Sequence, residues 1–307
     1  MHPIRLGLVG YGKIAQDQHV PAIRANPQFE LVAVATLGPH CPGVENFGSL
    51  SELLDSDVQV DAIAFCTPPQ GRFALVDEAL KAGKHVLVEK PPCSTLGEAF
   101  ALIDHVERAG VSGLFAWHSR FAPGVATAKA WLAGTTLNEV RIEWKEQVRK
   151  WHPGQAWIWQ AGGLGVFDPG INALSIVTDL LPGALFVESA ALSVPSNCQS
   201  PIAASLNIRD GHVPVKAAFD FDHSVNELWR IELHSDDGVL RLDSGGAEVS
   251  LDGVAQAVSE EGEYPAMYRH FAQLIADGRS DLDLQPLRIV ADSFFVGSKE
   301  TVAAFYE

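Results

Sequence analysis

The chain has 307 residues, of which 47% are hydrophobic and 20% are charged, which is enough for one large globular domain or two ordinary ones. Its formal net charge of −16 disfavours nucleic acid and anionic membrane surfaces as partners, because both repel a negative protein. The four cysteines are Cys41, Cys66, Cys93 and Cys198. They form no CxxC spacing or cluster, so we expect free thiols and no metal site. With no signal-peptide pattern and no membrane-spanning apolar run, we expect a cytoplasmic protein.

The first 120 residues alternate between short apolar runs and segments of helical periodicity. The runs predicted as strands are 4–9, 31–35, 62–66, 85–88 and 113–116. The segments predicted as helices between them include 14–25, 72–82 and 97–108. Continuous apolar strands joined by helical crossovers indicate a parallel sheet that is covered on both faces. We therefore expect residues 1–120 to form a doubly wound Rossmann domain, in which ligands bind at the carboxyl ends of the strands.

From residue 121 onward the pattern changes. The expected elements are a helix over 122–133, a half-polar strand over 138–150, a helix over 170–181, strands over 186–251 and two helices over 265–307. The strand region contains turn signals such as Asp210-Gly211 and Asp252-Gly253, which are typical of antiparallel connections. We therefore expect residues 121–307 to be an α+β domain with a large, mainly antiparallel sheet. The fold class is accordingly α/β, with this second domain following the Rossmann domain.

The segment Gly10-Tyr11-Gly12-Lys13-Ile14-Ala15 follows the first predicted strand and opens the first predicted helix. It fits the pattern G-x-G-x-x-G/A, in which the glycines permit a tight turn and a close approach of pyrophosphate. The helix N-terminus adds partial positive charge. A tight turn without a ligand is the alternative interpretation. The position after the first strand favours a dinucleotide site, and the candidate cofactor-binding residues here are Gly10, Gly12, Lys13 and Ile14.

The end of the second predicted strand bears on the choice of cofactor. Residues 34–40 contain neither the acidic residue that holds the ribose 2′-hydroxyl of NAD nor an arginine that pairs with a 2′-phosphate. Thr36 can hydrogen-bond to either ribose, and His40 is placed to lie near a 2′-phosphate. The missing arginine favours NAD, and NADP is kept as the alternative.

Two further strand ends carry polar residues at the ligand edge of the sheet. Thr67-Pro68-Pro69 follows the third strand, and Glu89-Lys90-Pro91-Pro92 follows the fourth. A lysine in this place lies over the ligand crevice, although a solvated lysine that caps a strand is equally compatible with the local sequence. We take Thr67, Pro68, Glu89 and Lys90 as further candidate cofactor-binding residues.

Asp168-Pro169 allows two interpretations. An aspartate followed by proline is typical of a helix N-cap with proline at the first helical position. If the helix has instead already begun at Asp168, Asn172 lies four residues later on the same helix face. A carboxylate beside an amide suits a polyhydroxyl substrate, because one accepts a proton while the other orients a neighbouring hydroxyl.

Several aromatic and polar residues form a candidate sugar site. Glu146, Trp151 and His152 follow one another near the end of the long predicted strand. A sugar offers a C–H face that stacks on aromatic rings and hydroxyls that need carboxylate or imidazole partners. Trp229, in a later strand, is a weaker candidate. The alternative is that these tryptophans belong to the core or to an interface.

Four motifs occur together in this order: Gly10-x-Gly12-x-x-Ala15, Thr67-Pro68-Pro69, Glu89-Lys90-Pro91, and Gly162-Gly163 followed by Asp168-x-x-x-Asn172. Over essentially the whole chain they resemble the Gfo/Idh/MocA oxidoreductase family. Residues 148–157 resemble its members that oxidise D-galactose or L-arabinose at C1. The resemblance implies that Lys90 reaches the reacting carbon, that Asp168 is the carboxylate of the second motif, and that Trp151 and His152 lie in the sugar pocket. His118 stands where the family often has asparagine in Asn-x-Arg-Phe/Tyr, so it is a candidate wall of the nicotinamide or sugar site, with a hydrogen-bonded loop histidine as the alternative. Many members carry histidine where this chain has Asn172, which shifts the proton chemistry onto Lys90 and Asp168.

We therefore expect an NAD(P)-dependent aldose 1-dehydrogenase with Lys90, Asp168 and Asn172 as catalytic residues. It would oxidise the C1 hemiacetal of D-galactose, together with L-arabinose, to the lactone. One alternative is oxidation of a secondary alcohol of an inositol or another sugar. A second is a dinucleotide-binding sensor without chemistry, which the joint presence of Lys90 and Asp168 disfavours. Residues 121–307 would bind the substrate and mediate oligomerisation, and the exposed face of their sheet favours a homodimer or a larger homo-oligomer.

Overall fold

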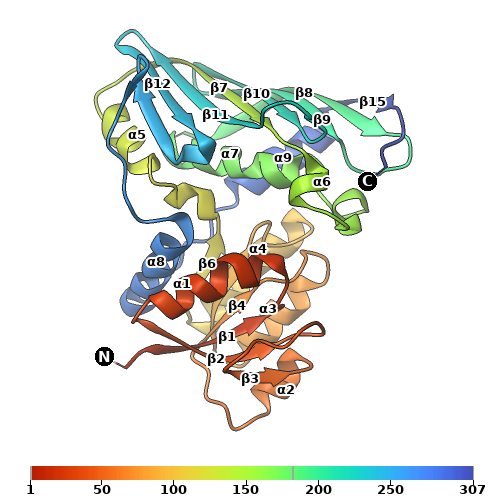
Figure 1. Cartoon of the computed structure of the whole chain (residues 1–307), viewed down its shortest axis with the longest axis vertical. Coiled ribbons are helices and arrows are strands. Elements are labelled where there is room, and N and C mark those ends of the chain that lie inside the picture. Colours follow the sequence, from red (N-terminus) through yellow and green to blue (C-terminus); the bar gives the residue numbers. More distant parts are fainter. Residues whose placement is uncertain (1, 182, 307) are drawn as a thin grey trace. The chain divides into compact units, whose positions relative to one another are not determined.

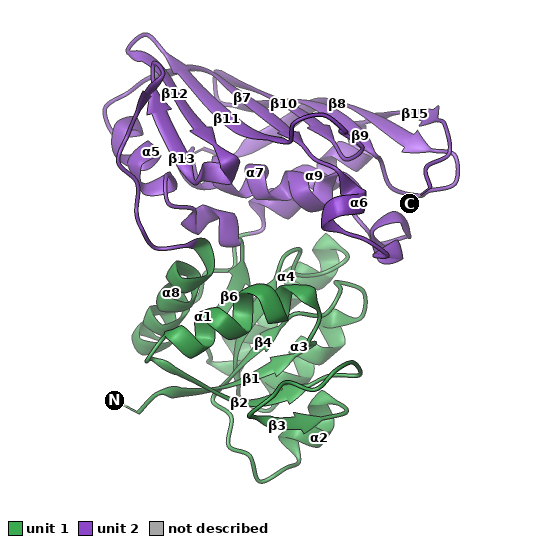
Figure 2. Ribbon diagram, in the orientation of Figure 1, with its two compact units in different colours: residues 1–117, 263–283 green, residues 118–262, 284–307 purple. Residues whose placement is uncertain are grey.

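The computed structural model describes residues 2–181 and 183–306 (Figure 1). The chain forms two compact units, which Figure 2 shows in different colours. Unit 1 comprises Met1–Trp117 and Glu263–Asp283, and unit 2 comprises His118–Gly262 and Leu284–Glu307. The units differ from the expected division after residue 120 in one main respect, since residues 263–283 belong to unit 1. Helix α8 (Glu263–Asp277) follows the strands of unit 2 in sequence but packs against α1 (Val20–Ala25) and β6 (Gly113–Ala116) of unit 1.

Within the described residues, unit 1 contains a six-stranded parallel sheet in the order β3-β2-β1-β4-β5-β6. Besides β6, its strands are β1 (Ile4–Val9), β2 (Phe29–Ala35), β3 (Glu45–Phe47), β4 (Ala62–Phe65) and β5 (His85–Glu89). All four residues of β4 are fully buried, because this strand lies inside the sheet with helices on its faces. The chain leaves β1 on one side and returns to β4 on the other, so the strand order switches at this pair. This confirms the predicted doubly wound fold.

The helices of unit 1 are α1, α2 (Leu50–Leu54), α3 (Arg72–Lys81), α4 (Leu96–Ala109) and α8. Of these, α1, α3 and α4 agree with the helices predicted over 14–25, 72–82 and 97–108. The first of these segments has an unexpected start. Residues Ala15–His19 form a π-turn, after which α1 continues as an ordinary α-helix. The short elements β3 and α2 were not predicted, because neither is long enough to show a hydrophobic period.

Unit 2 contains, among its described residues, a nine-stranded sheet in the order β14-β13-β12-β11-β7-β10-β9-β8-β15. The strands are β7 (Leu137–Lys145), β8 (Leu185–Pro195), β9 (Ala203–Asp210), β10 (Val213–Asp220), β11 (Leu228–Ser235), β12 (Gly238–Asp243), β13 (Glu248–Leu251), β14 (Val254–Ala255) and β15 (Ser298–Val302). The sheet is mainly antiparallel, as expected, although β7 pairs with β10 and β8 with β15 in parallel. Buried and exposed residues alternate clearly along β9, where Leu206 and Ile208 are buried while Ser205 and Asn207 are exposed.

The helices of unit 2 are α5 (Val125–Leu132), α6 (Val148–Trp151), α7 (Phe167–Leu180) and α9 (Gln285–Val296). Helices α7 and α9 pack against each other, and α9 packs against β8 (Figure 1). Twelve of the fourteen residues of α7 are buried, so this helix forms the core beneath the sheet. No helix in the described residues is long and apolar enough to cross a membrane.

Two predictions for unit 2 were wrong in their details. The strand expected over 138–150 ends at Lys145, and the short helix α6 replaces its last part. The Gln147 side chain accepts a hydrogen bond from the Arg149 N–H at 3.4 Å and so caps α6. The tail forms β15 in addition to the two expected helices. This strand, Ser-Lys-Glu-Thr-Val, lies at the edge of the sheet and is mostly exposed, so it lacks the apolar alternation of a predicted strand.

Candidate active site

The predicted glycine turn lies between β1 and the first helix. Gly10 has a φ of +90°, and a Cβ added to it would lie 3.0 Å from the Thr67 backbone nitrogen. A Cβ added to Gly12 would meet no described atom within 4 Å. Ala15 is fully buried, as expected for the small residue that lets helix and strand pack closely. Gly10 is thus required by the backbone, whereas Gly12 leaves space above the turn.

The turn after β4 lies beside this glycine turn, because β1 and β4 are neighbours and the Cys66 N–H donates to the Val9 carbonyl at 2.8 Å. The Thr67 Oγ1 atom is buried and has no hydrogen-bond partner among the described residues. Open space over Gly12, a helix N-terminus and an unused hydroxyl suit a phosphate-bearing ligand at the strand-order switch. These residues therefore fit a bound dinucleotide.

The other cofactor candidates of the first helix and of β2 are more exposed. Lys13 forms an ion pair with Asp17 on the next turn, and Ile14 is 38% exposed. The Thr36 Oγ1 atom accepts a hydrogen bond from the Gly38 N–H at 3.0 Å, so it stabilises the turn that follows β2. Pro68 is exposed on the turn after β4.

Glu89 and Lys90 end β5. The Glu89 side chain is only 4% exposed, and its Oε1 atom accepts a hydrogen bond from the Tyr264 hydroxyl at 2.8 Å. Its Oε2 atom accepts a hydrogen bond from the Lys90 backbone N–H at 2.7 Å. The peptide bond between Lys90 and Pro91 is cis. Although Glu89 was expected to bind the cofactor, these contacts engage both of its carboxylate oxygens inside unit 1.

His19 is a residue that sequence reasoning missed. It ends the π-turn, is fully buried, and places Nε2 3.0 Å from Glu89 Oε1 and Nδ1 2.7 Å from the Tyr268 hydroxyl. Burial alone lowers the pKa of His19, but the neighbouring Cys66 sulfur and the Glu89 carboxylate outweigh burial and raise it to about 10. No local pattern marks this histidine, because its partners lie far away in the sequence.

Arg72 is a second missed residue. It is the first residue of α3, is 2% exposed, and donates hydrogen bonds to the carbonyl oxygens of Thr67, Glu89 and Pro91. One guanidinium thereby connects the turn after β4 with the turn after β5. Its place directly after Thr67-Pro68-Pro69-Gln70-Gly71 was an available signal, since arginine can satisfy several carbonyls at once.

In unit 2 the two interpretations of Asp168 are resolved. Helix α7 begins at Phe167, so Asp168 lies in its first turn and is not the N-cap residue. Asp168 is 2% exposed, and Asn172 follows one turn later on the same face. This is the arrangement that places a carboxylate beside an amide.

Asp168 has an imidazole and a second carboxylate close by. The His152 Nε2 atom lies 3.7 Å from Asp168 Oδ2 and 3.8 Å from Glu146 Oε1. The Trp229 indole N–H donates to Glu146 Oε2 at 2.8 Å, and the His152 ring packs edge-on against Phe221. The ends of β7 and α6, the start of α7 and the strand β11 thus bring four predicted residues together.

The remaining candidates lie around this group or along α7. Trp151 is 36% exposed, its indole N–H donates to Glu227 Oε1 at 2.6 Å, and its ring centroid lies 5.4 Å from that of Trp229. His118 lies in the 3₁₀ turn His118–Phe121, which packs along α7, and its Nδ1 atom is 3.3 Å from Ser119 Oγ. Trp151 and Trp229 therefore offer adjoining aromatic surfaces.

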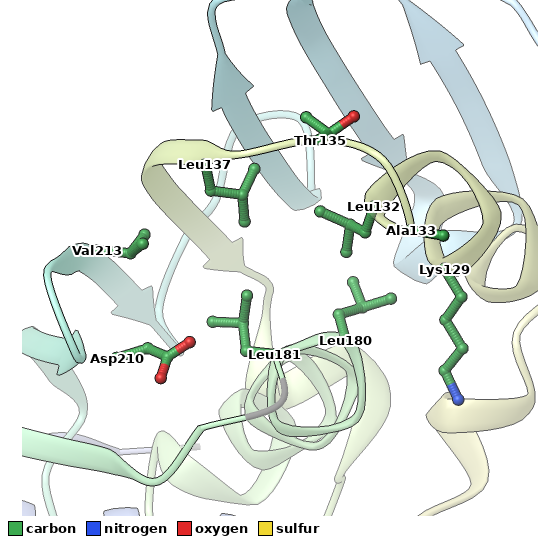
Figure 3. Close-up of a pocket in the computed structure, with 9 residues that line it drawn as sticks. All are labelled: Lys129, Leu132, Ala133, Thr135, Leu137, Leu180, Leu181, Asp210 and Val213. Atoms are coloured by element: carbon green, nitrogen blue, oxygen red, sulfur yellow. The ribbon is translucent and has the colours of Figure 1, made fainter.

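A cavity of about 350 Å³ lies elsewhere in unit 2 (Figure 3). It is lined by Lys129, Leu132, Ala133, Thr135, Leu137, Leu180, Leu181, Asp210 and Val213. Lys129 forms an ion pair with Asp179 at 2.7 Å, and burial raises the pKa of Asp210. None of the candidate residues lines this largely apolar cavity. Among the described residues, no group of three or more His, Cys, Asp or Glu side chains is arranged to hold a metal ion.

A doubly wound sheet with a glycine turn where the strand order switches is typical of dinucleotide-dependent proteins. In unit 2 the His152 imidazole lies near two carboxylates, those of Glu146 and Asp168. The family model described as an oxidoreductase family with an NAD-binding Rossmann fold matches residues 4–116. Together with a full-length relative of high identity, this shows that the chain belongs to the Gfo/Idh/MocA oxidoreductase family.

Three known proteins illustrate the similarity. The galactose 1-dehydrogenase of Pseudomonas fluorescens is 67% identical over 308 residues, which cover 100% of both chains. The crystal structure of a D-galactose-1-dehydrogenase protein from Rhizobium etli is 48% identical, has a TM-score of 0.96 and covers 100% of this chain and 99% of that one. A 3-ketoreductase from Actinomadura kijaniata, in complex with NADP and TDP-benzene, shares the fold, with 19% identity, a TM-score of 0.83 and coverage of 99% and 100%.

Proposed function

We propose that this protein is an NAD-dependent aldose 1-dehydrogenase that oxidises the C1 hemiacetal of D-galactose to the lactone. The observation that carries the proposal is the 67% identity to a galactose 1-dehydrogenase over the full length of both chains. The carboxylate, imidazole and indole groups around Asp168 supply the hydrogen-bonding and aromatic surfaces that a sugar requires. L-Arabinose is proposed as a second substrate, because it shares the ring hydroxyls and lacks only the exocyclic hydroxymethyl group.

Unit 1 is proposed to hold the cofactor, which when bound supplies the hydride acceptor. Gly10 and Gly12 shape the turn at the helix N-terminus, where backbone N–H groups and partial positive charge suit pyrophosphate. The other proposed cofactor-binding residues are Lys13, Ile14, Thr36, Thr67, Pro68, Glu89 and Lys90. The contacts of Glu89 inside unit 1 make its contribution an indirect one, through the backbone of Lys90.

Oxidation at C1 also removes the hydroxyl proton. We assign the acceptance of this proton to Asp168, which is buried and lies 3.7 Å from His152 Nε2. Lys90 shares the task, either by stabilising the developing oxyanion or by taking up the proton. A positioned base contributes about 10²- to 10⁴-fold to the rate. Asn172, one turn after Asp168, is proposed to orient a neighbouring sugar hydroxyl.

The remaining residues are proposed to bind the sugar. Trp151 and Trp229 offer adjoining rings for its C–H face, and Glu146 and His152 accept or donate hydrogen bonds to hydroxyls. His118 is proposed to form part of the wall of the nicotinamide or sugar site. Unit 2 as a whole would bind the substrate and mediate homo-oligomerisation through the exposed face of its sheet. A cytoplasmic location suits a nicotinamide-dependent enzyme with free thiols.

Initial rates of absorbance change at 340 nm test the proposal. D-Galactose, L-arabinose, glucose, xylose and inositol are each supplied with NAD or NADP. We expect the highest kcat/KM for D-galactose with NAD, followed by L-arabinose. A preference for inositol would favour oxidation of a secondary alcohol, and no reduction with any compound would favour a dinucleotide-binding sensor.

Two variants test the assigned chemistry. Lys90→Ala and Asp168→Ala should each lower kcat by at least about 100-fold, since each removes a group that acts on the proton. Cofactor affinity, measured by quenching of tryptophan fluorescence, should change much less than kcat, because the other proposed cofactor-binding residues are kept. Near-normal turnover in either variant would contradict the assignment.

A further inference from the structure

Unit 1 contains a buried group of hydrogen-bonding side chains that includes Glu89, next to Lys90 in the sequence, and is here named the Glu89 network. It consists of His19 from the π-turn, Glu89 from the end of β5, and Tyr264 and Tyr268 from α8. None of the four is more than 5% exposed. The group therefore joins the helix that starts at the glycine turn, the strand that leads to Lys90, and a helix more than 170 residues later in the chain.

The hydrogen bonds of this network fit an ionised Glu89 beside a protonated His19. Its carboxylate faces three donors, namely the Tyr264 hydroxyl at 2.8 Å, the Lys90 N–H at 2.7 Å and His19 Nε2 at 3.0 Å. An ionised carboxylate is an acceptor only and can serve all three, whereas a protonated one would have to donate through one oxygen. A buried carboxylate also needs a charged partner, and protonated His19 supplies it. His19 then donates through Nδ1 to the Tyr268 hydroxyl.

The Glu89 carboxylate and the Arg72 side chain hydrogen-bond to the two ends of the peptide group that joins Glu89 to Lys90. The Glu89 carboxylate accepts from the Lys90 N–H, and the buried Arg72 guanidinium donates to the carbonyl oxygens of Glu89 and Pro91. Both ends of the Glu89–Lys90 peptide group are therefore held by buried charged side chains. Charge-assisted hydrogen bonds of this kind are about twice as strong as neutral ones. They therefore restrict the position of the Lys90 backbone, from which its side chain extends.

We propose that Glu89, kept ionised by His19, is a positioning residue that fixes the backbone of Lys90 for catalysis. The inference rests on the proposed role of Lys90 in the oxidation of galactose. The π-turn is the structural reason that His19 takes part, because it ends at His19 and the ring is fully buried at Glu89. Through His19, the helix that opens at the glycine turn is connected to the residue that acts on the sugar.

Glu89→Gln is the decisive variant, because glutamine keeps the shape but replaces one acceptor oxygen by an NH₂ donor. It cannot accept from His19, Tyr264 and the Lys90 N–H together. Ser112→Ala is the matched control, since Ser112 is buried and its hydroxyl donates to the Leu274 carbonyl of α8 at 3.1 Å without contact to Glu89. Both variants lose a buried hydrogen bond between the sheet and α8, but only one acts on Lys90.

We expect Glu89→Gln to lower kcat for D-galactose by about 10- to 100-fold, because small misplacements of a catalytic group cost about this much. The KM for galactose and the Kd for NADH should stay within about threefold, and Ser112→Ala should stay within about twofold in all three. Hydrogen exchange with mass spectrometry supplies a readout without cofactor or substrate. The peptide that contains the Lys90 amide should exchange faster in Glu89→Gln but not in Ser112→Ala.

Equal losses of kcat in the two variants, or an unchanged kcat and exchange rate in Glu89→Gln, would overturn the proposal. Should Glu89→Gln not fold, Tyr264→Phe removes one of the three donors without changing charge and should lower kcat by about 2- to 5-fold with KM retained. An unchanged kcat in that variant would also overturn it. If the wild-type protein does not oxidise galactose, the proposed function fails, whereas the exchange measurement still decides whether Glu89 holds the Lys90 backbone.

Discussion

The two glycines of the first turn have different tasks, and alanine substitutions separate them. Gly10 has a φ of +90°, and a Cβ there would lie 3.0 Å from both the Thr67 nitrogen and its Cγ2 atom. Such a conformation costs a non-glycine residue about 1–3 kcal/mol. For a protein of this size, each kcal/mol lowers Tm by about 2–4 °C. Gly10→Ala should therefore lower Tm by several degrees even without cofactor.

Gly12→Ala should behave in the opposite way. The added methyl meets no described atom within 4 Å, so Tm of the free protein should be unchanged or slightly higher. A pyrophosphate that approaches this backbone would lose one or two charge-assisted hydrogen bonds, each worth about 1.5–3 kcal/mol. We expect the Kd for NADH to rise at least about 10-fold. Thermal scans and fluorescence titration of both variants measure these effects. An unchanged Kd in Gly12→Ala, or a Tm loss as large as that of Gly10→Ala, would refute the reasoning.

Two further predictions concern buried polar groups. Trp229→Phe removes the indole N–H that donates to Glu146 Oε2. Because a hydrogen bond to a charged group is worth about 1.5–3 kcal/mol, we expect a loss of this size in urea unfolding and a raised KM for galactose. Unchanged values of both would contradict the role of this bond. The pKa of His19 is raised from 6.5 in the unfolded chain to about 10, so its contribution to stability is complete below about pH 6.5 and is lost as the pH rises through about 10. The urea midpoint of unfolding should therefore decrease as the pH is raised from about 6.5 to about 10. In His19→Gln this decrease with pH should be smaller. An equal decrease in the two proteins would count against a protonated His19.

The elements that the sequence predicts well are those with strong local signals. The apolar strands of unit 1 and the glycine turn were predicted because each is coded by a few adjacent residues. The spacing of Asp168 and Asn172 gave their common helix face as soon as the start of α7 was known. In contrast, the polar edge strand β15 and the short α6 carry no periodic signal, since packing and capping determine them.

The candidate site shows the same division. Lys90 and Asp168 stand in recognisable motifs, but the residues that surround them do not. His19 meets Glu89 and Tyr268 across 70 and 249 residues of sequence, and no single-chain pattern reports such pairs. The expected contact of Glu89 with cofactor followed from its place at a strand end. Its side chain turns into the core because His19 and Tyr264 offer partners there.

The proposed function requires that hydride leaves C1 of galactose. The most direct measurement follows isotopic label from D-galactose that carries deuterium only at C1, with NAD as acceptor and the reduced cofactor examined by mass spectrometry and proton NMR. We expect reduced cofactor with one deuterium at the nicotinamide C4, together with an unlabelled galactonolactone. Unlabelled reduced cofactor, with the deuterium kept in the sugar product, would show that the hydride comes from another carbon and would rule out oxidation at C1.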